Sequence, residues 1–143
     1  MKKFKSKIII SLILALSITT MLSTSVFAYP SHDSFRIGSY DFNGDVYINA
    51  DGATATSSYG TIAGLQVKVE YWYRYGSNGN TYTSMKNQNS DASTKVSCYA
   101  TYDSGHITNR ESVRAVGKHH ISYNGVTKSL DTEIKFWLTN SLF

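Results

Sequence analysis

The sequence predicts an all-β protein, specifically an antiparallel β-sandwich of about seven or eight strands, with a small β-barrel as the alternative. Three observations support this fold class. Residues 65–75 alternate between apolar and polar positions with one exception, two hairpin dipeptides interrupt strand-like runs, and no helical periodicity follows residue 28. The expected strands differ in length, which favours the sandwich over the barrel.

Residues 65–75 carry the clearest strand signal. Every odd position is apolar or aromatic, and the even positions are polar with the exception of Trp72. A period of two places alternate side chains on opposite faces of a half-buried strand. Valine and tyrosine also suit a pleated surface. We therefore expect this segment to be the central strand.

The elements before this strand are marked by glycine. The sequence predicts strands at 34–40, 46–50 and 53–59, with a turn at 43–45. Asp51-Gly52 predicts a tight hairpin, because both residues tolerate positive φ. Gly60 and Gly64 predict a bend or bulge before residue 65. The run 53–59 is small and uncharged, so it is the candidate for an exposed sheet edge.

After residue 75 the chain alternates between turns and strands. The expected elements are a turn at 76–80, a short strand at 81–85, a polar loop at 86–91, a strand at 92–102 and a strand at 113–123 with a bulge at Gly117. Asn124-Gly125 then predicts the final hairpin. In the returning strand, 126–138, Leu130 and Ile134 share the inner face.

The first 28 residues have the layout of a secretory signal peptide. Four lysines precede an apolar run at 8–22, and Ser25-Val26-Phe27-Ala28 supplies small residues for cleavage after Ala28. A membrane-spanning helix needs about 20 apolar residues, more than this run provides. No cysteine near the cleavage point would carry a lipid, and no wall-sorting tail is visible. We expect a secreted protein without a membrane anchor.

Removal of the leader changes the charge of the protein. All ten acidic residues follow residue 28, whereas four of the fourteen basic residues precede it, so the mature chain has ten of each. A neutral chain gives no support for binding to nucleic acid or to anionic membranes. Residues 29–143 are enough for one domain with its own core.

Cys98 is the one cysteine, which excludes an intramolecular disulfide. It lies in a strand-like run, where we expect it to be a small buried hydrophobic residue. The alternative is an exposed thiol that pairs with another chain.

One segment partly matches a calcium-binding loop. Asp41, Asn43, Asp45 and Asn49 supply oxygen ligands at the first, third, fifth and ninth positions of an EF-hand pattern. The pattern fails at Val46, which replaces the required glycine, and at Gly52, which replaces the final acidic ligand. We therefore expect no metal here, and calcium remains the alternative interpretation.

Catalytic signatures are missing from the sequence. His32-Asp33-Ser34 holds the residue types of a hydrolase triad, but a triad comes from the fold rather than from adjacent residues. No nucleophile elbow or phosphate-binding loop is present. His119 and His120 are adjacent, so on a strand they point to opposite faces and cannot share a metal. We expect a protein without catalytic residues or a cofactor.

Aromatic residues provide the remaining signal. Trp72 and Trp137 both occupy otherwise polar faces of their expected strands, and Trp72 has Tyr73 and Arg74 as neighbours. An outward tryptophan can stack on a sugar ring or anchor a protein partner. These four residues form the predicted ligand-binding set. The alternative is that a loop or the chain terminus covers each tryptophan.

Together these features favour a small secreted, non-catalytic binding module that acts at the cell surface or in the medium. Its ligand would be a cell-wall glycan or an extracellular protein. The alternative is a bacteriocin-like or toxin-like antagonist, although a membrane-active peptide would be more cationic. The layout resembles that of small exported proteins of Gram-positive bacteria.

Overall fold

The computed structural model describes residues 30–75, 80–106 and 110–135. The leader, most of the 76–80 turn and Trp137 lie outside these ranges. The strands are β1 (Ser31–Ile37), β2 (Tyr40–Ile48), β3 (Gly52–Tyr75), β4 (Thr81–Thr101), β5 (Arg110–Tyr123) and β6 (Val126–Lys135). The described chain is therefore all-β, and it contains no helix long and apolar enough to cross a membrane.

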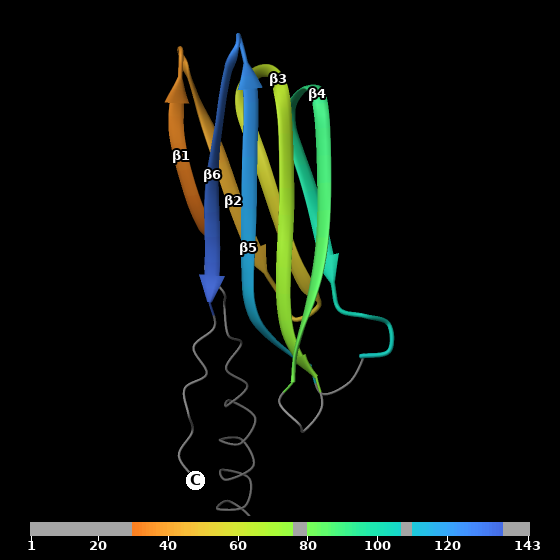
Figure 1. Cartoon of the computed structure of the whole chain (residues 1–143). Helices are drawn as coiled ribbons and strands as arrows, with labels where there is room; N and C mark the ends of the chain where they lie inside the picture. The colour runs from red at the N-terminus through yellow and green to blue at the C-terminus, as the bar shows by residue number, and fades with distance from the viewer. Residues whose placement is uncertain (1–29, 76–79, 107–109, 136–143) are drawn as a thin grey trace, which may run out of the picture.

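The strands form one antiparallel sheet that folds over on itself (Figure 1). The order is β1-β2-β3-β5-β6, and β4 also pairs with β3. The first half of β3 lies between β2 and the second half of β4, whereas its second half lies between β5 and the first half of β4. Residues 65–75 are thus central, as predicted.

The fold-over occurs within β3 and β4. The pairing of these strands shifts register between Ser58 and Ala63 and again between Ala63 and Leu65, where Gly60 and Gly64 predicted a bend. Neither strand breaks there, and β3 runs for 24 residues and β4 for 21. The expected count of about seven or eight strands falls to six because two pairs of expected strands are continuous.

Several local predictions are wrong, beginning with the expected strand at 34–40, which the structure divides between β1 and β2 at the turn of residues 38–39. Residues 86–91 belong to β4 rather than to a loop, because their backbone pairs with β3 while their polar side chains stay in water. Residues 43–45 lie inside β2 rather than in a turn. Residues 53–59 are paired on both sides, so they are not an exposed edge.

The glycines in β2 and β5 serve packing instead of turning the chain. Gly117 pairs with Val69 and Thr132 without a register shift, so the bulge predicted there is wrong. The register shift between β3 and β5 lies instead at Trp72 and Tyr73. A Cβ at Gly117 would lie 2.5 Å from Nε2 of His119, and one at Gly44 would lie 2.6 Å from its Cδ2. Both strands therefore need glycine to admit this imidazole.

Both predicted hairpins form, although the first turn spans residues 49–52 and Asp51 does not adopt positive φ. Asn49 and Gly52 close the β2–β3 turn through a backbone hydrogen bond of 2.9 Å. Asn124 and Gly125 have φ values of 48° and 75°, the left-handed pair that a two-residue hairpin with the right twist requires.

The core fills the space inside the folded sheet. Its members are mainly the inward residues of β2, β3 and β5, such as Phe42, Val67, Val69, Tyr71 and Ile121, all at most 1% exposed. Strands β1 and β6, at the two ends of the sheet, contact each other. The result is a nearly closed, barrel-like sheet.

Candidate functional site

The outward residues of the second half of the sheet form a flat surface, which we call the Trp72 face. Register places these residues in four cross-strand rows over β4, β3, β5 and β6. The rows are Asn89–Gln66–His120–Ser129, Asn87–Lys68–Lys118–Asp131, Met85–Glu70–Val116–Glu133 and Thr83–Trp72–Arg114–Lys135. The alternation that predicted a strand at 65–75 is what puts this polar set on one side.

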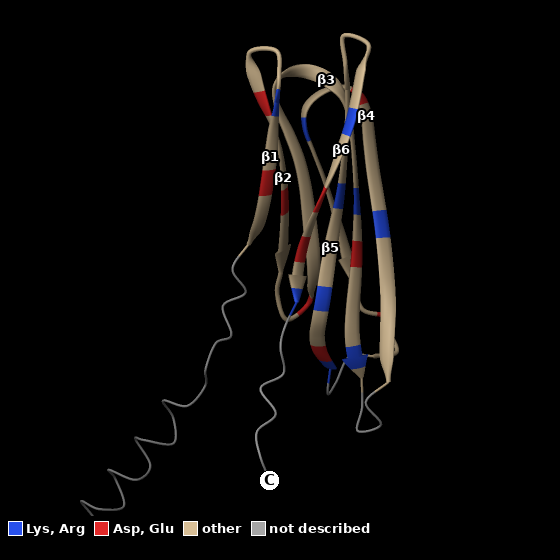
Figure 2. Cartoon of the chain, turned by 60° about the vertical axis from the view of Figure 1, so that its left-hand side comes forward, with Lys and Arg blue, Asp and Glu red and all other residues tan. Residues whose placement is uncertain are grey.

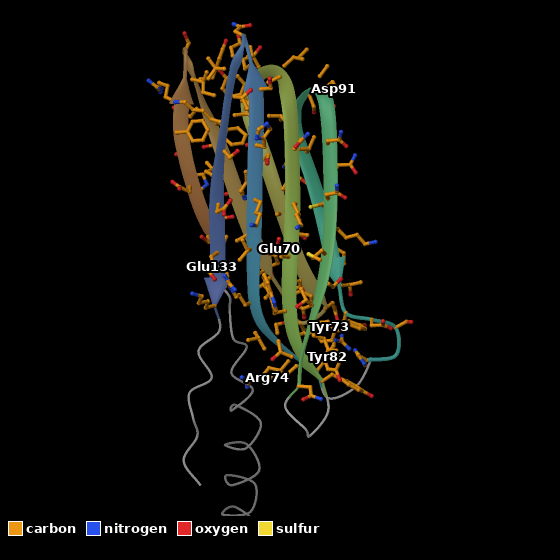
Figure 3. All side chains as sticks on the ribbon, in the orientation of Figure 1. Glu70, Tyr73, Arg74, Tyr82, Asp91 and Glu133 are labelled. Carbon is orange, nitrogen blue, oxygen red and sulfur yellow. The ribbon has the colours of Figure 1, made fainter. Side chains whose placement is uncertain are left out.

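Charges of both signs alternate over the Trp72 face (Figure 2). Glu70 lies near its centre (Figure 3), 2.8 Å from Nζ of Lys68 and 4.0 Å from Nζ of Lys118. Glu133 pairs with Arg114 and, at 3.4 Å, with Lys135. Burial acts to raise the pKa of Glu133, but the hydrogen bonds from these two cations lower it overall. The face is thus organised around two carboxylates, each held by two cations.

A groove crosses the first two rows of the Trp72 face. Its volume is about 470 Å³, and residues lining it include Gln66, Lys68, Asn87, Asn89, Lys118, His120, Ser129 and Asp131. Nδ1 of His120 and Oγ of Ser129 are 2.9 Å apart at one side. The amide and hydroxyl groups in this set can donate and accept hydrogen bonds and the ammonium groups can donate them, so the groove suits a polar ligand.

The structure separates the four predicted ligand-binding residues. Trp72 and Arg74 are on the Trp72 face, whereas Tyr73 points to the interior and is 2% exposed. Trp137 lies outside the described residues. The guanidinium of Arg114 sits 4.7 Å from the ring centroid of Trp72, and both residues are half-buried. Trp72 is therefore two rows away from the groove and packs against its own neighbour.

Arg74 is the unusual member of this set. Its Nε is buried and has no hydrogen-bond partner in the part of the chain that the structure describes. In register it lies opposite Glu111 of β5 and Thr81 of β4, at the end of the sheet beyond the Trp72 row.

The calcium candidates are spread along strand β2 and the turn after it. Asp41 pairs with Arg36 at 2.8 Å, and this hydrogen bond lowers the pKa of the carboxyl group. Asp45 pairs with His32 at 2.7 Å. Successive outward positions of a strand lie roughly 7 Å apart, so side chains at 41, 43 and 45 do not converge on one point. Oδ1 of Asn49 instead accepts the N–H groups of the turn.

The histidines have separate environments. His119 faces the core and His120 faces outward, as their adjacency predicted. His106 stacks on Tyr75 at 4.2 Å, with its Nδ1 2.9 Å from the hydroxyl of Tyr73, near the Tyr73–Tyr82 end of the sheet (Figure 3). Among the described residues, no group of three or more histidine, cysteine and acidic side chains is placed to hold a metal ion.

Besides His120 and Ser129, a buried serine and histidine lie at hydrogen-bonding distance. Oγ of Ser57 is 3.0 Å from Nδ1 of His119, and Oγ1 of Thr132 is 2.8 Å from Nε2. All three residues are at most 2% exposed. Their burial makes this set a hydrogen-bond network of the core.

Sequence reasoning missed the groove because it assigned Asn87 and Asn89 to a loop. The available signal was alternation: residues 83, 85, 87 and 89 continue one outward face beside β3. The residues at 84, 86 and 88, between these outward positions, are polar as well. The sequence therefore shows no apolar–polar alternation there, because an edge strand can be polar on both faces.

Comparison with known proteins adds no relative to this description. No protein-family model matches the chain, and no curated protein is detectably similar to it in sequence.

Proposed function

We propose that this protein is a secreted, non-catalytic binding protein that holds a cell-wall glycan in the groove of the Trp72 face. The observation that carries the proposal is the groove itself, which the outward side chains of four strands line with polar groups. Such a surface offers many weak, directional contacts to a ligand rich in hydroxyl groups.

The groove chemistry favours a glycan that carries amides and carboxylates. Lys68 and Lys118 lie directly opposite each other on adjacent strands, and Glu70 lies within 4.0 Å of both ammonium groups. Each ammonium group has three N–H donors, so a carboxylate on the ligand could accept hydrogen bonds from those that Glu70 does not use. Asn87 and Asn89 on the adjacent strand can each donate and accept, which suits sugar hydroxyls and amide groups.

Export and architecture are part of the proposal. The lysine-rich start and the apolar run at 8–22 support a leader that is removed after Ala28. We treat the folded sheet as a β-sandwich, because no register among the described strands pairs β1 with β6. Mass spectrometry of protein from the culture medium tests the cleavage site, since an N-terminus other than Tyr29 would contradict it.

Sedimentation with purified peptidoglycan tests the binding. Asn89→Ala and Lys118→Ala should each weaken retention about tenfold or more, which corresponds to the loss of one or two polar contacts. Lys95→Ala is the matched control, because Lys95 is exposed but faces outward on the other half of the sheet. Thermal unfolding of each variant verifies that the fold is intact.

Three outcomes would contradict the proposal. Retention unchanged in both groove variants would exclude the groove, and retention lost only in Trp72→Ala would move the site to the tryptophan row. Absence of retention on any cell-wall glycan would exclude the ligand class. A zone of growth inhibition around producing cells, without glycan binding, would favour the antagonist.

A further inference from the structure

The outer face of the first half of the sheet carries two exposed tyrosines in one cross-strand row. Tyr47 of β2 lies opposite Thr54 of β3, and Thr54 lies opposite Tyr99 of β4. Tyr47 is 48% exposed and Tyr99 is 43% exposed, whereas the flanking inward residues Ala53 and Ala55 are fully buried. The two rings therefore lie on the solvent side, two strands apart.

Tyr99 lies down on the sheet because its neighbour is a glycine. A Cβ placed on Gly52 would meet the carbonyl oxygen of Ala100 first, and then Cζ and the hydroxyl oxygen of Tyr99 at 2.9 Å. Any other residue at position 52 would therefore clash with the backbone of β4 as well as with this ring. One side of the ring thus covers the chain at Gly52, while the rest of the residue remains exposed.

The side chains around the two rings are mostly hydroxyl-bearing, and the charged Asp45 of β2 lies in the row next to Tyr47. Thr56 and Ser97 occupy the adjacent row and share a hydrogen bond of 2.8 Å between their hydroxyl oxygens. On the other side, the hydroxyl of Thr101 donates to the carbonyl of Asp51. The nearest charged side chains, Asp45 and Asp51, are each paired, with His32 and with Arg110.

We propose that the row Tyr47–Thr54–Tyr99 is a second binding site, which takes a neutral polysaccharide chain lying across the strands. Adjacent strands are about 4.8 Å apart, so the two tyrosines are separated by roughly 10 Å, a distance that a disaccharide unit spans. Sugar rings have apolar faces that stack on aromatic rings, and a tyrosine hydroxyl keeps one end of that ring wet.

The chemistry of the row favours a glycan over a protein. Protein-binding hot spots combine aromatic residues with deep, desolvated pockets. Here the side chains between and beside the rings include Thr54, Thr56 and Ser97, and the carboxylate of Asp45 beside Tyr47 is paired with His32. Hydroxyl groups at this spacing complement the equatorial hydroxyls of a neutral sugar, and no charge in the row calls for an ionic ligand.

This site is distinct from the groove of the Trp72 face, because the two lie on the outer surfaces of different halves of the folded sheet (Figure 1). Either can be correct without the other.

Native affinity electrophoresis of protein produced from the full-length sequence tests the site. Gels would contain a soluble neutral polysaccharide: hydroxyethyl cellulose, xylan, galactomannan or dextran. We expect at least one to retard the protein, and Tyr47→Ala or Tyr99→Ala to reduce that retardation at least fivefold. Tyr40→Ala is the matched control, because Tyr40 is 45% exposed but is not in this row. Tyr47→Phe and Tyr99→Trp should retain binding, since each keeps an aromatic face.

The same experiment can overturn the proposal. Unretarded migration in all four polysaccharides, or equal losses in the Tyr40 variant and the row variants, would exclude the site. Loss of retardation in Lys118→Ala but not in Tyr99→Ala would assign neutral glycans to the groove instead. Binding of a protein partner that requires Tyr47 and Tyr99, without polysaccharide binding, would also refute it.

Discussion

His119 donates the hydrogen of its Nδ1 to Oγ of Ser57 over 3.0 Å, inside the folded sheet. The direction follows from the partners. The hydroxyl of Ser57 donates to the carbonyl of Gln66, so its oxygen must accept from the imidazole. Nε2 then accepts from the hydroxyl of Thr132 at 2.8 Å. A neutral imidazole thereby connects the first half of β3 to β5 and β6, the two halves of the sheet.

We expect the stability of the protein to fall as pH is lowered from 6.5 to 4. Burial lowers the pKa of His119 from 6.5 to about 4, and the nearby carboxylates of Asp45 and Asp131 only partly oppose this. Between these pH values the unfolded chain binds a proton that the folded chain does not, so folding weakens with acid. The difference is worth about 3 kcal/mol. Urea unfolding at pH 7, 5.5 and 4 measures it.

His119→Leu provides the control for this pH effect. The variant removes the titrating group, so its stability should vary less with pH over the same window, whatever its stability at pH 7. Equal slopes for both proteins between pH 6.5 and 4 would show that His119 is not the cause.

Gly44→Ala and Gly117→Ala should each destabilise the protein by about 2 kcal/mol, because an added methyl group would overlap the His119 side chain. Gly105→Ala is the control, since a Cβ there would lie 3.7 Å from Oδ1 of Asp103, an ordinary contact, and its cost should be close to zero. Thermal unfolding at pH 7 distinguishes the variants. A loss of stability no larger than that of the control would mean that the space around His119 can relax.

Cys98 should react slowly with thiol reagents in the folded protein. Its side chain is half-buried and lies 3.6 Å from the carbonyl oxygen of Val67, and burial raises the pKa of the thiol. Less thiolate and less access together predict labelling at pH 8 at least about tenfold slower than in urea. A colorimetric thiol assay measures both rates. Rapid labelling, or a disulfide-linked dimer on a non-reducing gel, would instead support the exposed-thiol alternative.

Lys86→Val should increase self-association. Lys86 pairs with the buried Val69, so it shares the inward face, yet it remains exposed because β4 forms an edge of the sheet in the described structure. An inward charge on an edge strand opposes pairing with another chain. Lys95→Val is the control, because that lysine faces outward. Sedimentation velocity compares the two, and equal dimer fractions would contradict a protective role for Lys86.

The local features of this fold were readable from the sequence. The alternation at 65–75 predicted the central strand, because side-chain period is a property of the strand itself. Asn124-Gly125 predicted the last hairpin, because its positive φ values depend on two residues alone. Outward placement of Trp72 followed from the same alternation.

Other features depended on partners distant in sequence. The polar run at 86–91 is a strand only because β3 supplies its hydrogen bonds, and no apolar pattern within it records that pairing. Gly44 and Gly117 looked like turn and bulge residues, but their role is set by an imidazole from another row of the core.

The sequence by itself determined an all-β chain, the hairpins at 49–52 and 124–125 and the two-faced character of its central strand, since each depends on contacts between near neighbours. Only the tertiary structure decided where β3 and β4 bend across the sheet. It also decided which polar residues line the groove and that Tyr47 and Tyr99 share a row. These arrangements come from strand register, which joins residues far apart in the chain.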